Sequence, residues 1–207
     1  MLIGLDGLSI ARFHDLALND PEPGSSTSPV SLDAWHWITE NHRYNTLLWR
    51  EEDKARRTDV AADAIAASKR LIDQYNQKRN DAIEALDEAV LTTLGNIKPA
   101  EDARLNSETA GAMIDRLSIL ALKIFHMREQ TERSDASPSH INACHSKLER
   151  LIVQRQDLVS CLDRLLAEAA QGRAYFKVYR QFKMYNDPTL NPYLYGQRLS
   201  RAGKIAP

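Results

Sequence analysis

Apolar and polar residues alternate at helical spacing through most of this chain, and the pattern predicts four long helices. The predicted helices cover residues 32–57, 61–94, 107–133 and 140–170. Ile72 and Leu86 stand at heptad positions in the second helix, and leucines repeat at the same spacing in the fourth. Because the connections between these helices are short, we expect an all-α, antiparallel up-and-down bundle.

Breaks in the pattern predict where individual helices begin and end. Thr58 or Asp59 should cap the second helix at its start, and Gly95 should end it. The centre of the third helix, MIDRLSILALKIFHM, is apolar on nearly every side, so we expect it to be the most buried element. Long heptad repeats also suit a two-fold interface, and a homodimer is therefore a second expectation.

Both ends of the chain depart from the bundle pattern. Residues 1–31 predict a short amphipathic helix followed by a linker, PEPGSSTSPVS, which is too rich in Pro, Gly and Ser to bury a core. Residues 173–207 hold five of the seven tyrosines, seven Lys or Arg and one acid, and they should form an irregular tail. We expect a short helix through Tyr175 and Tyr179 there, with aromatic rings packed on the bundle of residues 32–172.

Composition narrows the class of protein without indicating a reaction. The 207 residues suffice for one domain with a core, and a net charge of −1 favours no nucleic-acid partner for the basic tail. Cys144 and Cys161 lie about 25 Å apart on one predicted helix, which excludes a disulfide between them. The chain has no apolar run near the ~20 residues of a membrane span and no basic signal-peptide start, so we expect a cytoplasmic protein.

Polar residues occupy positions where a plain amphipathic helix would place leucine. In the first long helix, His42, Asn45 and Glu52 fall in phase with two tryptophans, and in the second a polar stripe runs from Asp73 to Asp87. Burying such groups costs free energy unless they are paired, so they indicate either a ligand site or a structural network inside the bundle. The candidate ligand-binding residues are His42, Asn45, Glu52, Arg56, Lys69, Asp73, Asn76, Gln77, Arg79, Asn80, Glu84, Asp115, Arg116 and His126.

Arg79 is the most specific of these candidates because it stands at a heptad position between Ile72 and Leu86. A buried guanidinium without a partner would cost several kcal/mol. We therefore expect Arg79 to be largely buried and hydrogen-bonded to a carboxylate, with Asp115, Glu52 and Asp53 as the candidates. Glu52 itself stands four residues before Arg56, a spacing that favours an ion pair.

Several chemistries lack their usual motifs. The chain has no Glu-x-x-His pair of the di-iron bundles, no zinc spacing of cysteines, no Gly-rich phosphate loop and no G-x-S-x-G elbow. We therefore expect no metal and no cofactor. The mixture of Arg, Lys, Gln and Glu in residues 69–84 is similar to that of chorismate-mutase-like helical enzymes, which keeps an enzyme among the alternatives.

Four strings together resemble a bacterial family of helical proteins, a domain of unknown function. They are HRYNTLLWREEDKARR, KRLIDQYNQKRNDAIEALDE, TAGAMIDRLSILALKIFHM and YNDPTLNPYLYG. The resemblance implies cytoplasmic helical proteins that are often encoded near glycosyltransferases of envelope-glycan assembly. It implies no activity.

Three functions follow as hypotheses. The first is a non-catalytic accessory or binding protein for envelope-polysaccharide machinery, with a glycosyltransferase as a partner. The second is an enzyme that acts on a small anionic substrate, such as a nucleotide-sugar or a dicarboxylate. The third is a purely structural bundle whose polar network fixes the register of its helices.

Overall fold

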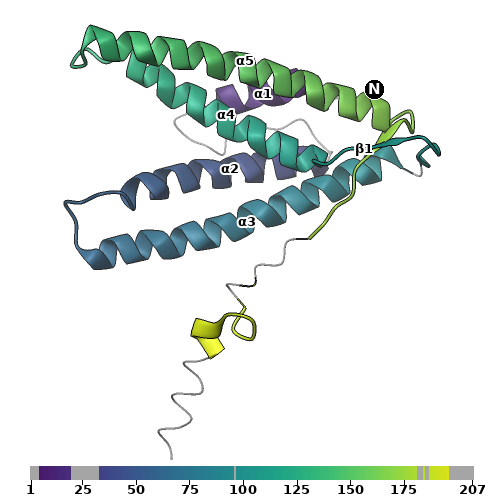
Figure 1. Ribbon diagram of the computed structural model, residues 1–207, viewed down its shortest axis with the longest axis horizontal. Coiled ribbons are helices and arrows are strands. Elements are labelled where there is room, and N and C mark those ends of the chain that lie inside the picture. The colour runs from purple at the N-terminus through teal and green to yellow at the C-terminus, as the bar shows by residue number, and fades with distance from the viewer. Residues whose placement is uncertain (1–4, 20–32, 96, 181–183, 185–186, 196–207) are drawn as a thin grey trace, which may run out of the picture.

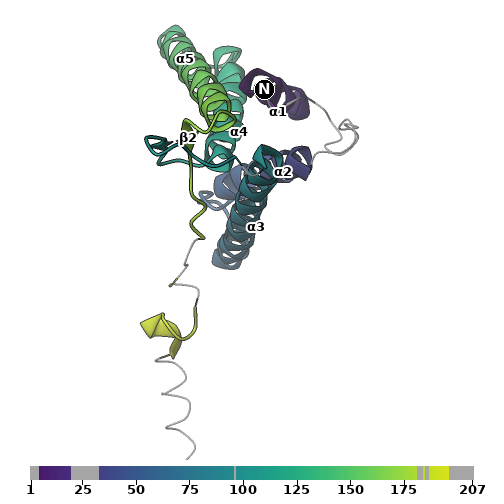
Figure 2. The same ribbon diagram turned by 90° about the vertical axis from the view of Figure 1, so that its right-hand side faces the viewer.

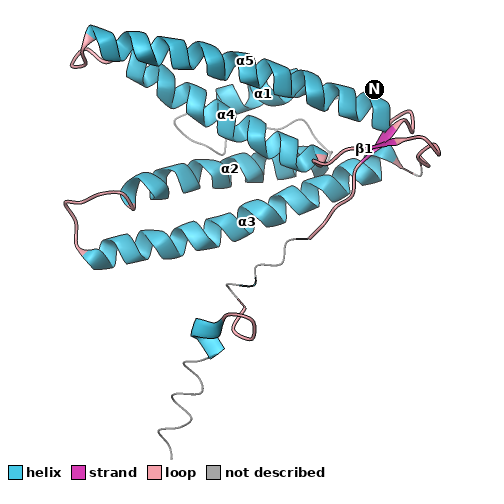
Figure 3. Ribbon diagram, in the orientation of Figure 1, coloured by secondary structure: helices cyan, strands magenta, loops and turns pink. Residues whose placement is uncertain are grey.

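The computed structural model describes residues 5–19, 33–95, 97–180, 184 and 187–195, and it confirms the all-α bundle (Figure 1). Four helices are long, and a shorter one precedes them. Two very short strands and a single helical turn at residues 192–195 complete the described part of the chain (Figure 3). In chain order the elements are α1 (Gly7–Asn19), α2 (Asp33–Lys54), α3 (Ala62–Leu94), β1 (Arg104–Leu105), α4 (Ala110–Thr131), α5 (Pro138–Ala169) and β2 (Ala174–Tyr175).

The long helices form two antiparallel hairpins, α2 with α3 and α4 with α5 (Figure 1). Helix α4 is central, because it contacts α1, α2 and α3 as well as α5. Its apolar side chains Ile114, Leu117, Leu122 and Ile124 are almost completely buried. The expectation that the third long helix is the most buried is therefore confirmed, and any polar side chain on α4 that faces inward must find its partners inside the protein.

Helix ends follow local capping chemistry in two cases and depart from it in a third. Thr109 caps α4 by accepting a hydrogen bond from the Ala112 N–H, and Ser137 caps α5. Helix α3 starts after Ala61 without a side-chain cap, so the expectation of a cap from Thr58 or Asp59 is wrong. Asp59 instead binds the guanidinium of Arg57 at 2.7 Å in the turn between α2 and α3.

The tail begins differently from the prediction. Ala174 and Tyr175 form β2, which pairs in parallel with β1, so the helix expected through Tyr175 and Tyr179 is wrong in this part of the chain. Ala174 and Phe176 are buried, and this short pairing closes one end of the bundle. Tyr179 and Tyr193 are exposed, and the linker that we expected at 21–31 lies outside the described residues.

Among the described residues, no helix combines the length and the apolar character that crossing a membrane would require.

Candidate functional site: a buried polar cluster beside an open groove

A cluster of polar side chains lies buried between α2 and α4. Asp115 Oδ1 on α4 accepts hydrogen bonds from the amide groups of Asn41 and Asn45 on α2, each at 2.8 Å. The Asn45 amide also donates to Ser118 Oγ at 3.0 Å, and Ser118 Oγ lies 2.8 Å from His42 Nδ1. All five side chains are buried. We call Asn41, His42, Asn45, Asp115 and Ser118 the polar cluster.

The direction of these hydrogen bonds assigns the protonation of His42. Because Ser118 Oγ accepts from Asn45, its own hydrogen is available to donate to Nδ1 of a neutral His42. The ring proton then sits on Nε2, which is buried without a hydrogen-bond partner among the described residues. Burial lowers the pKa of His42 to about 4, and the charge of Asp15 only partly opposes this effect. His42 is therefore uncharged at neutral pH.

His14 of α1 covers the outer face of this imidazole. The two rings stack with their centroids 4.6 Å apart and an angle of 24° between their planes. His14 is completely buried, and neither of its ring nitrogens has a hydrogen-bond partner among the described residues. Burial, with the neighbouring His42 and Arg155 adding to it, holds the pKa of His14 well below its ordinary value.

Arg79 on α3 approaches the polar cluster from the other side. Its Nε lies 4.0 Å from Asp115 Oδ1, and its terminal nitrogen donates to Asn80 Oδ1 at 3.4 Å. The expected partner carboxylate is thus Asp115. However, the 4.0 Å distance is too long for a direct hydrogen bond, so the expected hydrogen bond to a carboxylate is wrong, and the Arg79 side chain is 27% exposed.

An open groove begins where the polar cluster ends. It consists of two adjoining pockets that share Trp49 and Asp53 of α2. The first pocket, which we call the α3-side pocket, has a volume of about 370 Å³ and lies between α2, α3 and α4. Five of the sequence candidates line it, namely Asn45, Glu52, Arg56, Asn76 and Arg79. Asn45 and Arg79 therefore touch both the groove and the polar cluster.

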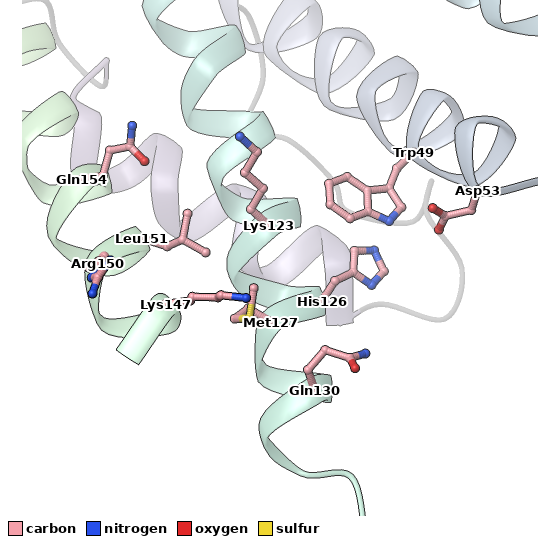
Figure 4. A pocket seen from close by; sticks show the side chains of 10 residues that line it. All are labelled: Trp49, Asp53, Lys123, His126, Met127, Gln130, Lys147, Arg150, Leu151 and Gln154. Carbon is pink, nitrogen blue, oxygen red and sulfur yellow. The ribbon is translucent and has the colours of Figure 1, made fainter. Parts of the chain in front are cut away.

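The second pocket, which we call the α5-side pocket, has a volume of about 620 Å³ and lies between α2, α4 and α5 (Figure 4). Lys123 of α4 and Lys147 and Arg150 of α5 line it. None of these three cations has a hydrogen bond or an ion pair with another described residue. Asp53 is the only acid among the described residues of the lining, which therefore carries excess positive charge.

An aromatic stack stands between the two pockets. The ring of His126 on α4 lies parallel to the indole of Trp49, with centroids 4.7 Å apart and 13° between the planes (Figure 4). His126 Nδ1 is 2.7 Å from Glu129 Oε2, which fixes the orientation of the imidazole. The stack gives the groove a wall with an apolar aromatic surface.

Six candidates belong neither to the polar cluster nor to the lining of the groove, and of these only Asn80 lies next to the cluster. Asn80 is buried against Arg79 at the edge of the cluster. Glu52 forms the expected ion pair with Arg56 at 2.7 Å, which confirms that prediction. The other five candidates line neither pocket, and they are Lys69, Asp73, Gln77, Glu84 and Arg116.

Asp87, the last residue of the polar stripe on α3, has a structural position of its own. Its Oδ1 accepts a hydrogen bond of 2.6 Å from the Gly111 N–H in the first turn of α4. A Cβ on Gly111 would lie 2.7 Å from the carbonyl oxygen of Ile83, so only glycine permits this approach of the two helices. Burial raises the pKa of Asp87 to about 6, although the hydrogen bonds from Thr109 and Gly111 oppose the shift.

Sequence reasoning missed several residues of both regions. Asn41 precedes Asn45 by four residues, and Ser118 follows Asp115 by three, so each shares a helix face with a residue that we did select. His14 likewise shares a face with Ile10. The cations Lys147 and Arg150 gave no such signal, because isolated basic residues on a predicted helix are ordinary surface residues.

Glu51 corrects a detail of the first helix. We expected Glu52 on the inward face, yet its neighbour Glu51, which was not among the candidates, is the more buried of the two. Its carboxylate binds Lys54 at 2.7 Å and faces Ser68 of α3, and these hydrogen bonds lower the pKa of Glu51. Glu51 therefore belongs to the contact between α2 and α3 rather than to the groove.

No group of three or more His, Cys, Asp or Glu side chains within the described ranges is arranged to hold a metal ion. No curated protein and no solved structure shows significant similarity to the chain. The sequence profile of one family, described as Protein of unknown function (DUF4254), matches residues 35–178, a range that includes the whole groove and the polar cluster but not α1. Since this match covers well over half of the sequence, the chain belongs to the DUF4254 family.

Proposed function

We propose that this protein is a non-catalytic accessory protein of envelope-polysaccharide machinery, and that its groove binds a small anionic, hydroxyl-rich ligand. The observation that carries the ligand proposal is a set of three cations on one side of an open pocket, Lys123, Lys147 and Arg150, which have no partner in the part of the chain that the structure describes. The link to glycan assembly, with a glycosyltransferase as partner, rests on the family resemblance of the sequence.

The α5-side pocket favours the anionic part of such a ligand. Lysine ammonium and arginine guanidinium groups bind phosphate or carboxylate oxygens through charge-assisted hydrogen bonds. Here the two helices α4 and α5 present three such groups, and no described acid consumes their donors. An anion that enters the pocket therefore gains these bonds without first breaking an ion pair.

The α3-side pocket favours a hydroxyl-bearing part. Its lining balances two acids, Glu52 and Asp53, against two arginines, and it adds the amides of Asn45 and Asn76. Carboxylates and amides can accept and donate hydrogen bonds to sugar hydroxyls, whereas the balanced charge offers little to a bare polyphosphate. Together with the indole of Trp49, the two pockets suit a phosphorylated sugar, with a sugar nucleotide as the leading class.

The lining of the groove also supports binding without catalysis. Among the described residues that line the two pockets, no serine, threonine, tyrosine or cysteine side chain is present to act as a nucleophile. One observation favours an enzyme as the second candidate. His126 is oriented by Glu129 in the way that a general base is oriented by a carboxylate, and its ring borders the groove.

Calorimetric titration with a panel of sugar nucleotides, sugar phosphates, neutral sugars and dicarboxylates tests the ligand proposal. We expect the phosphorylated sugars to bind, and the Lys147→Ala/Arg150→Ala double variant to weaken them at least tenfold. The matched control is Lys98→Ala/Lys177→Ala, which removes the same charge from exposed positions that line neither pocket. A panel without any binder, or equal losses in both double variants, would contradict the proposal.

Product analysis of the bound compounds separates the two candidate functions. Unchanged ligand after prolonged incubation supports a binding protein, and turnover that His126→Ala abolishes supports the enzyme. The cytoplasmic location and the homodimer remain predictions that belong to the same proposal. Fractionation of cells tests the first, and light scattering at micromolar concentration tests the second.

A further inference from the structure

Helix α1 covers the polar cluster from outside the region that the family profile matches. It packs on α4 and α5, and Figure 2 shows it on one flank of the bundle beside α4. Ile10, Ala11 and His14 on its inner face are buried, and Phe13 meets Trp35 and His42 of α2 edge to face. Removal of α1 would therefore expose His42 and its hydrogen bond to Ser118.

Among the described residues, few polar contacts hold α1 in this position. Its first N–H, that of Gly7, donates to Asp163 of α5 at 2.7 Å. Asp15 binds the guanidinium of Arg155 on α5 at 2.6 Å. A helix of 13 residues is marginal in water by itself, so α1 should lose its helical hydrogen bonds whenever it leaves the bundle. Undocking is thus visible as a loss of backbone protection.

The contact between His14 and His42 is the unusual part of this interface. Both rings are buried and stacked, and three of their four nitrogens have no hydrogen-bond partner among the described residues. The charged groups around the pair come from three elements, namely Asp15 on α1, Asp115 on α4 and Arg155 on α5. Asp15 is already paired with Arg155, and Asp115 accepts from two amides, so neither is free to bind an imidazolium.

We propose that α1 is an acid-releasable cap, in which protonation of the stacked His14–His42 pair detaches the helix and opens the polar cluster to solvent. A proton on either ring would place a charge in a buried site without a free acceptor. A second proton would set two positive charges on stacked rings whose centroids are 4.6 Å apart. The undocked state has neither penalty, because water solvates both rings. The cap operates whether or not the groove binds a ligand.

The direction and size of the effect follow from linkage. The docked rings resist protonation, so the undocked state takes up more protons once the pH falls below the ordinary histidine value of 6.5. Docking is therefore fully favourable above that pH and weakens as the pH falls toward 4. Between pH 7 and pH 5, a shift from 6.5 to about 4 at His42 alone changes the docking equilibrium by about 20-fold. His14 adds to this factor.

Hydrogen exchange of the full-length protein, followed by mass spectrometry at pH 7 and pH 5, tests the proposal. Protection factors, corrected for the pH dependence of intrinsic exchange, should fall at least 20-fold for the amides of α1. Those of α4 should fall much less, since α4 stays in the bundle. Equal losses in α1 and α4, or unchanged protection of α1, would overturn the proposal.

Two variants separate titration from simple weakening of the interface. His14→Phe retains a stacked ring but removes one titrating group, so its acid-dependent loss of protection should be smaller than that of the wild type. Asp15→Asn breaks the ion pair with Arg155 and should lower protection of α1 at both pH values, with the acid dependence retained. An acid response of His14→Phe as large as that of the wild type would also overturn the proposal. Thermal melts at pH 7 verify that each variant is folded.

Discussion

The polar cluster and the groove are neighbouring regions that share helices α2 and α4. Their polar side chains differ in whether they have hydrogen-bond partners within the described chain. In the cluster, Asn41 and Asn45 of α2 direct their amide donors to acceptors on α4 within 3.0 Å. In the groove, Lys123 and Lys147 have no partner among the described residues. A polar residue on the inward face of a helix can therefore indicate either of two things. It belongs to a structural network if the chain supplies its partner, and to a candidate ligand site if the chain does not.

The two regions should respond differently to mutation for that reason. A side chain whose partners lie in the chain contributes to stability, because its removal leaves buried donors without acceptors. A side chain without partners contributes little, since its charge is solvated in the folded and unfolded states alike. Asn45 belongs to both regions, so it is the residue through which a change in one could reach the other.

The largest expected effect is in the cluster. Asp115→Ala removes the acceptor of two buried amide donors, and we expect it to lower the free energy of unfolding by about 3–5 kcal/mol. Asp115→Asn retains an acceptor oxygen and should cost less. Asp53→Ala, the matched change of an exposed acid in the groove, should cost about 0.5 kcal/mol or less. Urea denaturation measures all three, and similar losses for Asp115→Ala and Asp53→Ala would erase the distinction between the regions.

The second prediction concerns Asp87, a buried acid outside the cluster, whose raised pKa should make the stability of the protein depend on pH. Its pKa of about 6 in the folded state exceeds the unfolded value of 3.8, so folding takes up a proton between these limits. Its contribution to stability is full below pH 3.8 and is lost as the pH rises through 6. Relative to Asp87→Asn, the wild type should therefore lose up to about 3 kcal/mol between pH 4 and pH 7.

Denaturant titrations of both proteins across this pH range measure the difference directly. His42 and His14 change stability with the opposite sign in part of this window, but they are present in both proteins and cancel. A difference that stays constant with pH would show that Asp87 is ionised in the folded state at all these values.

Periodicity predicted the fold because burial on a helix repeats with the helix itself. The bounds of α3 and α5 agree with the predicted ones within a few residues, and the central position of α4 follows from its apolar faces. The strands escaped prediction, because each has only two residues and depends on a partner about 70 positions away. Such pairing is set by tertiary contacts and not by local pattern.

The candidate site was only partly predictable for a related reason. The residues on α2 share one face, so phase alone brought Asn45 and Glu52 together. The stripe on α3 was misleading, since its Asp73 end is exposed and its Asp87 end is buried. Phase fixes the direction of a side chain around its helix, but the neighbour that it meets along the axis depends on how the hairpins are placed.

Arg79 tests the boundary between the two regions. At 4.0 Å from Asp115 and 27% exposed, its guanidinium should be coupled to that carboxylate by about 1 kcal/mol or less. A double-mutant cycle of Arg79→Met and Asp115→Asn measures this coupling. A value of several kcal/mol would move Arg79 into the closed network, whereas a value near zero would leave it to the groove.

The smallest expected effect concerns the groove cations themselves. Lys147→Ala/Arg150→Ala should change the free energy of unfolding by less than about 0.5 kcal/mol, even though it removes two charges from one face of α5. Any change should be a gain, because Lys123, Lys147 and Arg150 repel one another across the same pocket. The gain should grow at low ionic strength, where screening is weaker. Urea denaturation at two salt concentrations measures it. A loss of stability above about 1 kcal/mol would mean that these cations do have partners within the chain. Their charge would then contribute to folding, and it would no longer support a ligand site.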